Sequence, residues 1–223
     1  MLVPLRRENF QQIIPMVATG PQYAYYWGKP SDWLRRFLIS FLSALVFWII
    51  RSIGPEPLKE LALLLICISL IYWLWAPVYW ASMRNAKYRK YSYSGFWQGT
   101  VTNVYISEEV VREEITVNSK GELITIESLE KRINIEAKDK DGFKVKKYAP
   151  LRPIFKNIKP GIKAEALIIS NREDLSEIDH ISDLYLPEVK LWIGRYPYLR
   201  RDLFTQISEE INRTDKRARY NKT

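Results

Sequence analysis

The residues best suited to acid–base chemistry lie in one short segment, residues 177–183. The only histidine of the chain, His180, stands there among carboxylates, which can tune a neighbouring imidazole as a general base. The acidic residues near it are Glu173, Asp174, Glu177, Asp179 and Asp183. Their spacing lacks the pattern and the glycine of an EF-hand calcium loop. We therefore interpret the segment as a surface loop and not as a catalytic or metal site.

Other signatures of catalysis are missing from the sequence. It contains no phosphate-binding glycine loop, no G-x-S-x-G and no H-E-x-x-H. Its single cysteine, Cys67, lies inside an apolar run, which excludes a disulfide framework and any multi-cysteine metal site. We expect a protein that is not an enzyme and that holds no cofactor or metal.

A group of lysines forms a possible basic patch. Its members are Lys138, Lys140, Lys144, Lys146 and Lys147, with Phe143 and Tyr148 beside them. Lysines mixed with aromatic residues are typical of surfaces that bind single-stranded nucleic acid. However, residues 91–223 carry 23 Lys and Arg against 21 Asp and Glu, far from the charge of a nucleic-acid-binding domain. We expect no nucleic-acid partner, and we favour contact with anionic lipid or with an acidic surface.

The net charge of +9 is concentrated in the first part of the chain, where residues 1–90 carry 11 Lys and Arg against 4 Asp and Glu. This charge flanks two apolar runs. Residues 61–83 contain no charged residue, and a helix of that length reaches about 34 Å, enough to cross a hydrocarbon core of roughly 30 Å. Residues 37–50 form a shorter run. It extends to residues 33–53 if Arg35, Arg36 and Arg51 snorkel to the membrane surfaces.

Between the two runs lies the sequence Gly54-Pro55-Glu56-Pro57, which ends one helix and begins the next. The sequence thus predicts a transmembrane α-helical hairpin over residues 33–83, with spans at about 33–53 and 58–82 and a kink at Pro77. The basic residues at its open end are Arg6, Arg7, Lys29, Arg35, Arg36, Arg84, Lys87, Arg89 and Lys90. The positive-inside rule then places both termini in the cytoplasm, or on the stromal side in a plastid. A signal peptide is disfavoured because the first run begins late and a second follows at once.

Aromatic residues gather near the ends of both runs. Tyr72, Trp75 and Tyr79 share one helix face by their spacing. They could face a partner helix, although an interfacial aromatic belt explains such residues more simply.

The remaining segments predict a membrane-associated N-terminus and a β-rich domain. Residues 1–32 read as an interfacial segment with apolar Phe10, Ile13, Ile14 and Val17. Residues 91–195 alternate apolar and polar residues between turn signals, which predicts a small OB-like or SH3-like barrel in the cytoplasm. An amphipathic helix follows at 196–213, and residues 214–223 read as a disordered basic tail.

Several segments resemble a known family. They are residues 4–10 (PLRRENF), 18–23 (ATGPQY), 150–153 (PLRP), 158–161 (IKPG), 164–170 (AEALIIS) and 191–201 (LWIGRYPYLRR). Together they are similar to a cyanobacterial family of two-span membrane proteins, often labelled phosphate ABC transporter permease. The resemblance implies a plasma or thylakoid membrane and no catalytic residues. Two spans without an acidic residue, lysine or histidine in their interior argue against a permease.

These observations favour a non-enzymatic, membrane-anchored accessory or assembly factor for a larger membrane complex, which the resemblance would make photosynthetic. The expected partners are the lipid bilayer and a membrane-protein complex. A small subunit of a transporter and a cytoplasmic-face ligand-binding or sensor barrel remain as alternatives. Whether the barrel binds a small molecule stays open.

Overall fold

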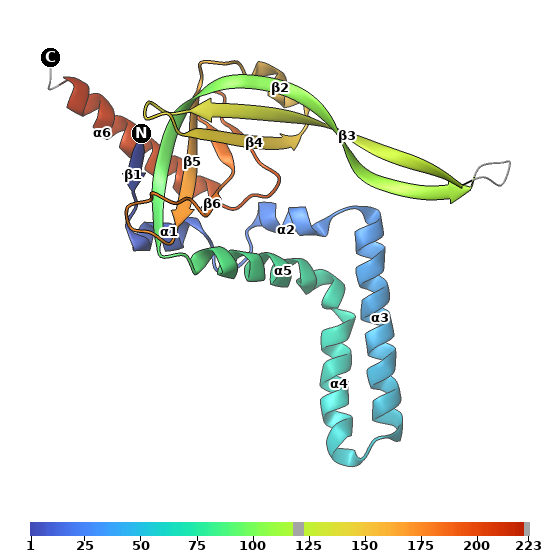
Figure 1. The fold of residues 1–223 in the computed structure, drawn as a ribbon. Coiled ribbons are helices and arrows are strands. Elements are labelled where there is room, and N and C mark those ends of the chain that lie inside the picture. The colour runs from blue at the N-terminus through green and yellow to red at the C-terminus, as the bar shows by residue number, and fades with distance from the viewer. Residues whose placement is uncertain (118–122, 221–223) are drawn as a thin grey trace. The chain divides into compact units, whose positions relative to one another are not determined.

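The computed structural model describes residues 1–117 and 123–220 (Figure 1). The chain forms two compact units. Residues 11–90 make a helical unit, and residues 1–10 join residues 91–223 in a second, β-rich unit. The first helix, α1 (Arg7–Ile13), crosses the boundary between them.

Four helices build the helical unit. They are α2 (Gly20–Trp27), α3 (Pro30–Ile53), α4 (Glu56–Leu70) and α5 (Tyr72–Arg89). Prolines stand in the first turns of α2, α3 and α4, where a fixed φ suits the helix and no amide donor is missed. The Gly54 amide closes α3 by donating to the Ile50 carbonyl at 2.8 Å. Helices α3 and α4 then run antiparallel as a hairpin (Figure 1).

The second apolar segment is not one helix, and the prediction of a continuous span over residues 58–82 is wrong. The chain breaks at Ile71, and α4 and α5 meet at an angle of 77°. Pro77 is not the break, because it lies buried inside α5. Among the described residues, α3 alone is long and apolar enough to cross a membrane by itself, whereas α4 and α5 qualify only as a bent pair.

The β-rich unit is one antiparallel sheet with a C-terminal helix. Its strands are β1 (Leu2–Pro4), β2 (Tyr93–Val117), β3 (Leu123–Lys138), β4 (Lys144–Pro150), β5 (Lys163–Ser170), β6 (His180–Ile181), β7 (Leu184–Leu186) and β8 (Leu191–Ile193). The order is β4-β3-β2-β5-β7-β8, with β1 on β2 and β6 on β5. A 3-10 turn, η1 (Pro153–Asn157), and helix α6 (Arg201–Tyr220) complete the unit. The β-rich prediction is confirmed. Neither the OB-like nor the SH3-like barrel is confirmed, because among the described strands no ladder of hydrogen bonds joins β4 to β8 and closes the sheet.

Apolar side chains cover both faces of the central strands. One core collects buried residues from six strands, among them Trp97, Ile135 and Leu184. On the other face, Phe204 of α6 is fully buried and its ring lies 5.4 Å from that of Phe96. Hence β5, between both layers, is buried almost throughout. Gly99 of β2 has a packing reason, since a Cβ at this position would lie 2.5 Å from the Trp97 ring.

Both chain ends differ from their predictions. Residues 2–4, which lie in the predicted interfacial segment, form strand β1 and pair with β2, Leu2 opposite Trp97. In the same segment Phe10 is buried, whereas Val17 is exposed. The predicted C-terminal helix exists but starts at Arg201 and continues to Tyr220. Most of the tail predicted as disordered is therefore helical, and residues 221–223 lie outside the described part of the chain.

Candidate functional site

The hairpin of α3 and α4 has its small residues inside and its large apolar residues outside. Ser40 and Ala44 of α3 and Ala62 and Ser69 of α4 are the residues that these two helices bury. The residues that point outward include Leu34, Phe37, Leu38, Phe41, Leu42, Trp48, Leu61, Leu64 and Leu70, which are all exposed. A helical hairpin in water shows the reverse arrangement. Small residues at a helix–helix contact and apolar residues around it are typical of helices packed in lipid.

Two side-chain donors, one hydroxyl and one indole, bind backbone carbonyls next to the break in the hairpin. Ser40 donates through its Oγ to the Ser69 carbonyl, and the Trp75 indole donates to the Ile68 carbonyl at 3.3 Å. Both carbonyls belong to the last turn of α4, where the break at Ile71 removes the usual amide donors. Both carbonyls beside the break therefore have side-chain partners.

Helix α2 is fixed to α5 by a buried pair of amides that the sequence analysis missed. Gln22 and Asn85 are fully buried. The Gln22 Nε2 donates to Asn85 Oδ1 at 3.1 Å, and the Asn85 Nδ2 donates to Gln22 Oε1 at 2.9 Å. The Thr19 amide adds a hydrogen bond to the same Gln22 oxygen at 3.1 Å. Because an unpaired buried amide is costly, this pair sets the register between the two helices.

The structure brings the predicted aromatic residues together. Tyr72, Trp75 and Tyr79 follow one another in edge-to-face contacts, with ring centroids 5.2 and 5.9 Å apart. Trp73 of α5 contacts Trp27 of α2 and Trp33 of α3, at 6.0 and 6.2 Å. That the first three face a partner stays a prediction.

The predicted basic residues of the membrane flanks serve different roles. Arg6, Lys29, Arg35, Lys87 and Lys90 are exposed, and Arg84 is half-buried. Arg36 donates to the Asp32 carbonyl at 3.1 Å and lies 5.5 Å from the Trp27 ring. Arg89 donates to the carbonyls of Gln11 and Ile14. Arg7 contacts the carbonyls of Tyr91 and Ser92 inside the β-rich unit. Some of this charge therefore binds backbone rather than facing outward.

The five lysines of the predicted basic patch do not form one surface. Lys138 and Lys144 lie opposite each other in the register of β3 and β4. Lys146 pairs with Glu136 at 3.6 Å. Lys147 points to the other face, where its Nζ donates to the Ile181 carbonyl at 2.5 Å and burial lowers its pKa. The strand period of two separates Lys146 from Lys147.

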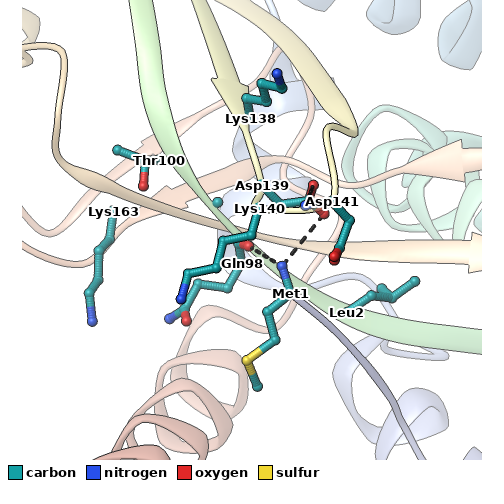
Figure 2. Close-up of a pocket in the computed structure, with 10 residues that line it drawn as sticks. Met1, Leu2, Gln98, Thr100, Lys138, Asp139, Lys140, Asp141 and Lys163 are labelled. Carbon is teal, nitrogen blue, oxygen red and sulfur yellow. Dashed lines mark hydrogen bonds and ion pairs between the residues drawn. The ribbon is translucent and has the colours of Figure 1, made fainter.

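Lys138 and Lys140 line a cavity of about 590 Å³ together with Lys163, Asp139 and Asp141. Figure 2 shows Lys140 and Lys163 extending in the same direction, whereas Lys138 points away from them. Burial alone would raise the pKa of Asp139, but hydrogen bonds from the Trp97 indole and the Phe143 amide hold it below its usual value. The cavity thus carries charges of both signs that are partly paired.

The acidic residues around His180 differ in their burial in the structure. Glu173, Asp174, Glu177 and Asp179 are exposed, whereas Asp183 is 2 % exposed. Burial raises the pKa of Asp183 to about 7, although the charge of Arg201 and hydrogen bonds from nearby backbone amides act to lower it. The His180 ring is half-buried and lies 4.8 Å from that of Tyr198, so it is not the surface residue that the sequence suggested. No group of three or more His, Cys, Asp or Glu suited to a metal occurs among the described residues.

The comparison with protein families gives one result. Residues 3–215 match the family described as "Family of unknown function (DUF8619)". The chain belongs to this family. Neither the curated proteins nor the solved structures contain a match. The match covers the helical unit and the β-rich unit together.

Proposed function

We propose that this protein is a non-enzymatic, membrane-anchored adaptor. In this proposal the hairpin of α3 and α4 enters the bilayer, and the β-rich unit stays in the aqueous phase and binds a larger membrane complex. The cyanobacterial resemblance suggests that the complex is photosynthetic.

The inside-out hairpin is the observation that supports the anchor best. Its helices bury Ser40, Ala44, Ala62 and Ser69 against each other and leave their leucines, phenylalanines and isoleucines uncovered. Exposed apolar area on that scale marks a membrane or protein interface. The aromatic contacts of Trp27, Trp33 and Trp73 fit the headgroup level, where indole rings are enriched.

The short α4 limits how the hairpin can sit. Fifteen residues reach about 22 Å, less than a typical hydrocarbon core. The turn at Ile71 then lets α5 run at a steep angle to α4, which suits a helix that lies along the surface. We infer that α3 and α4 cross the membrane and that α2 and α5 form an interfacial layer.

The adaptor role is tested on the full chain in its native membranes. An alkaline carbonate wash should leave the protein in the pellet, and mild-detergent native electrophoresis should show it migrating with a complex that mass spectrometry identifies. Release by carbonate contradicts the anchor. Recovery of the 26.4 kDa chain only as a free monomer contradicts the adaptor role.

A further inference from the structure

The strands β2 and β3 continue beyond the sheet as a two-stranded ribbon, residues 106–117 and 123–131 (Figure 1). β5 pairs with β2 only from Tyr93 to Thr100, and β4 pairs with β3 only from Arg132 to Lys138. Within the described part of the chain, the two strands of the ribbon therefore pair only with each other. A two-stranded ribbon on its own is marginal in water, and its open edges can pair with another chain.

One face of this ribbon is apolar and uncovered. The register places Val110 opposite Leu129, and residues opposite each other share a face. Ile115 and Leu123 lie further along on that face, and their side chains are 73 % and 75 % exposed. Val110 and Leu129 are exposed as well. The ribbon thus presents a row of apolar side chains that no second layer covers in the described part of the β-rich unit.

The same ribbon is acidic in a basic protein. It carries six glutamates against Arg112 and Lys131, whereas the whole chain has a net charge of +9. Glu127 is exposed and lies on the apolar face, between Leu123 and Leu129 along β3. A cation presented by a partner would pair with this carboxylate.

We infer that the apolar face of the ribbon binds a protein that presents an apolar patch with a basic residue at its centre. The inference rests on the proposed adaptor function and names the chemistry of its partner. An anionic bilayer is disfavoured because its negative surface would repel the glutamates. A second copy of the chain is disfavoured because it would bring one acidic ribbon against another. A basic protein surface is complementary in both charge and polarity.

Photo-cross-linking in native membranes tests this face directly. Benzoylphenylalanine replaces either Leu123 on the apolar face or Thr116, which is also exposed and belongs to the opposite face. We expect one protein adduct at position 123 and roughly tenfold less at position 116. Peptide mapping should place the cross-link beside a lysine or arginine of the partner.

Charge reversal supplies the matched control. Glu127→Lys should lower the adduct yield at position 123 by about tenfold, the effect of 1.4 kcal/mol on binding. Glu173→Lys makes the same charge change at an exposed loop residue and should leave the yield unchanged. Equal adducts on both faces, adducts only with lipid, or adducts of twice the chain's mass overturn the inference. Native electrophoresis of the same membranes separates the two proposals. If the chain migrates with a complex but gives no face-specific adduct, the inference about the ribbon is contradicted and the proposed adaptor function is not.

Discussion

At the scale of single residues, Cys67 reports on the proposed anchor. It is the only cysteine in the sequence, and its side chain is exposed on α4. If that surface faces hydrocarbon, a water-soluble reagent cannot reach the thiol. We expect a water-soluble maleimide to label Cys67 in intact membranes roughly tenfold more slowly than in denaturant. Equal labelling in both states would show that this face of α4 meets water.

Asp183 predicts how stability depends on pH. Its pKa is about 7 in the folded chain and about 3.9 in an unfolded one. At a pH between these two pKa values, Asp183 is therefore protonated in the folded state and ionised in the unfolded state. Stability should fall as pH rises through this window, by roughly 4 kcal/mol at the limit. Tryptophan fluorescence during chemical unfolding of the detergent-solubilised chain measures it.

Asp183→Asn is the variant that isolates this effect, because an amide of the same shape does not titrate. It should be more stable than the unchanged protein, and by more at pH 8 than at pH 5, because the cost of protonating Asp183 on folding grows across this window. The opposite order at pH 8 would mean that Asp183 is ionised and stabilised by Lys147 and Arg201, the charged groups that face it.

What the sequence reveals about residues depends on how local the signal is. The apolar runs and the alternation of the β-rich unit were predicted because each follows from neighbouring residues. The Gln22–Asn85 pair joins residues 63 apart, and no local pattern marks two ordinary amides as partners. The error at Lys147 was avoidable, because alternation in β4 already places it on the face opposite Lys146.

At the scale of elements, small residues set the contact between α3 and α4. Ala62 is 2 % exposed there, so Ala62→Leu should force the helices apart and cost about 1–3 kcal/mol. Leu64→Ala changes an outward residue of the same helix and should cost far less. Thermal unfolding of the solubilised protein compares them. Equal destabilisation by both changes would show that Leu64 also packs in the folded chain.

The elements also show where sequence reasoning stops. Glycine and proline marked the end of α3 and the start of α4 correctly, because both residues act on their own backbone. The break at Ile71 was missed, since that position carries neither of them. Beside the break, the Ser69 carbonyl accepts a hydrogen bond from Ser40, 29 residues earlier in the chain, and the Ile68 carbonyl accepts one from the Trp75 indole. The N-terminal strand was missed for a similar reason, because β1 is three residues long and gains its stability from β2.

At the scale of the whole molecule, the distribution of charge and apolar surface predicts a topology. Exposed apolar side chains concentrate on α3 and α4, whereas Arg51, Glu56 and Lys59 lie at the closed end of the hairpin. The open end has the larger excess of Lys and Arg. By the positive-inside rule the closed end should cross to the far side of the membrane, and residue 87 should remain in the cytoplasm.

Two single-cysteine variants in a Cys67→Ser background test that topology. Ile53→Cys places a thiol at the closed end, where the native side chain is 82 % exposed, and Lys87→Cys places one at an exposed position near the end of α5. In sealed cells or correctly oriented vesicles, an impermeant maleimide should label position 53 at once and position 87 only after permeabilisation. Labelling of position 87 at once and of position 53 only after permeabilisation would invert the orientation, because the open end of the hairpin would then lie outside. Labelling of both positions without permeabilisation would instead mean that the hairpin enters the bilayer and returns without crossing it, a geometry that the 22 Å estimated for α4 also permits.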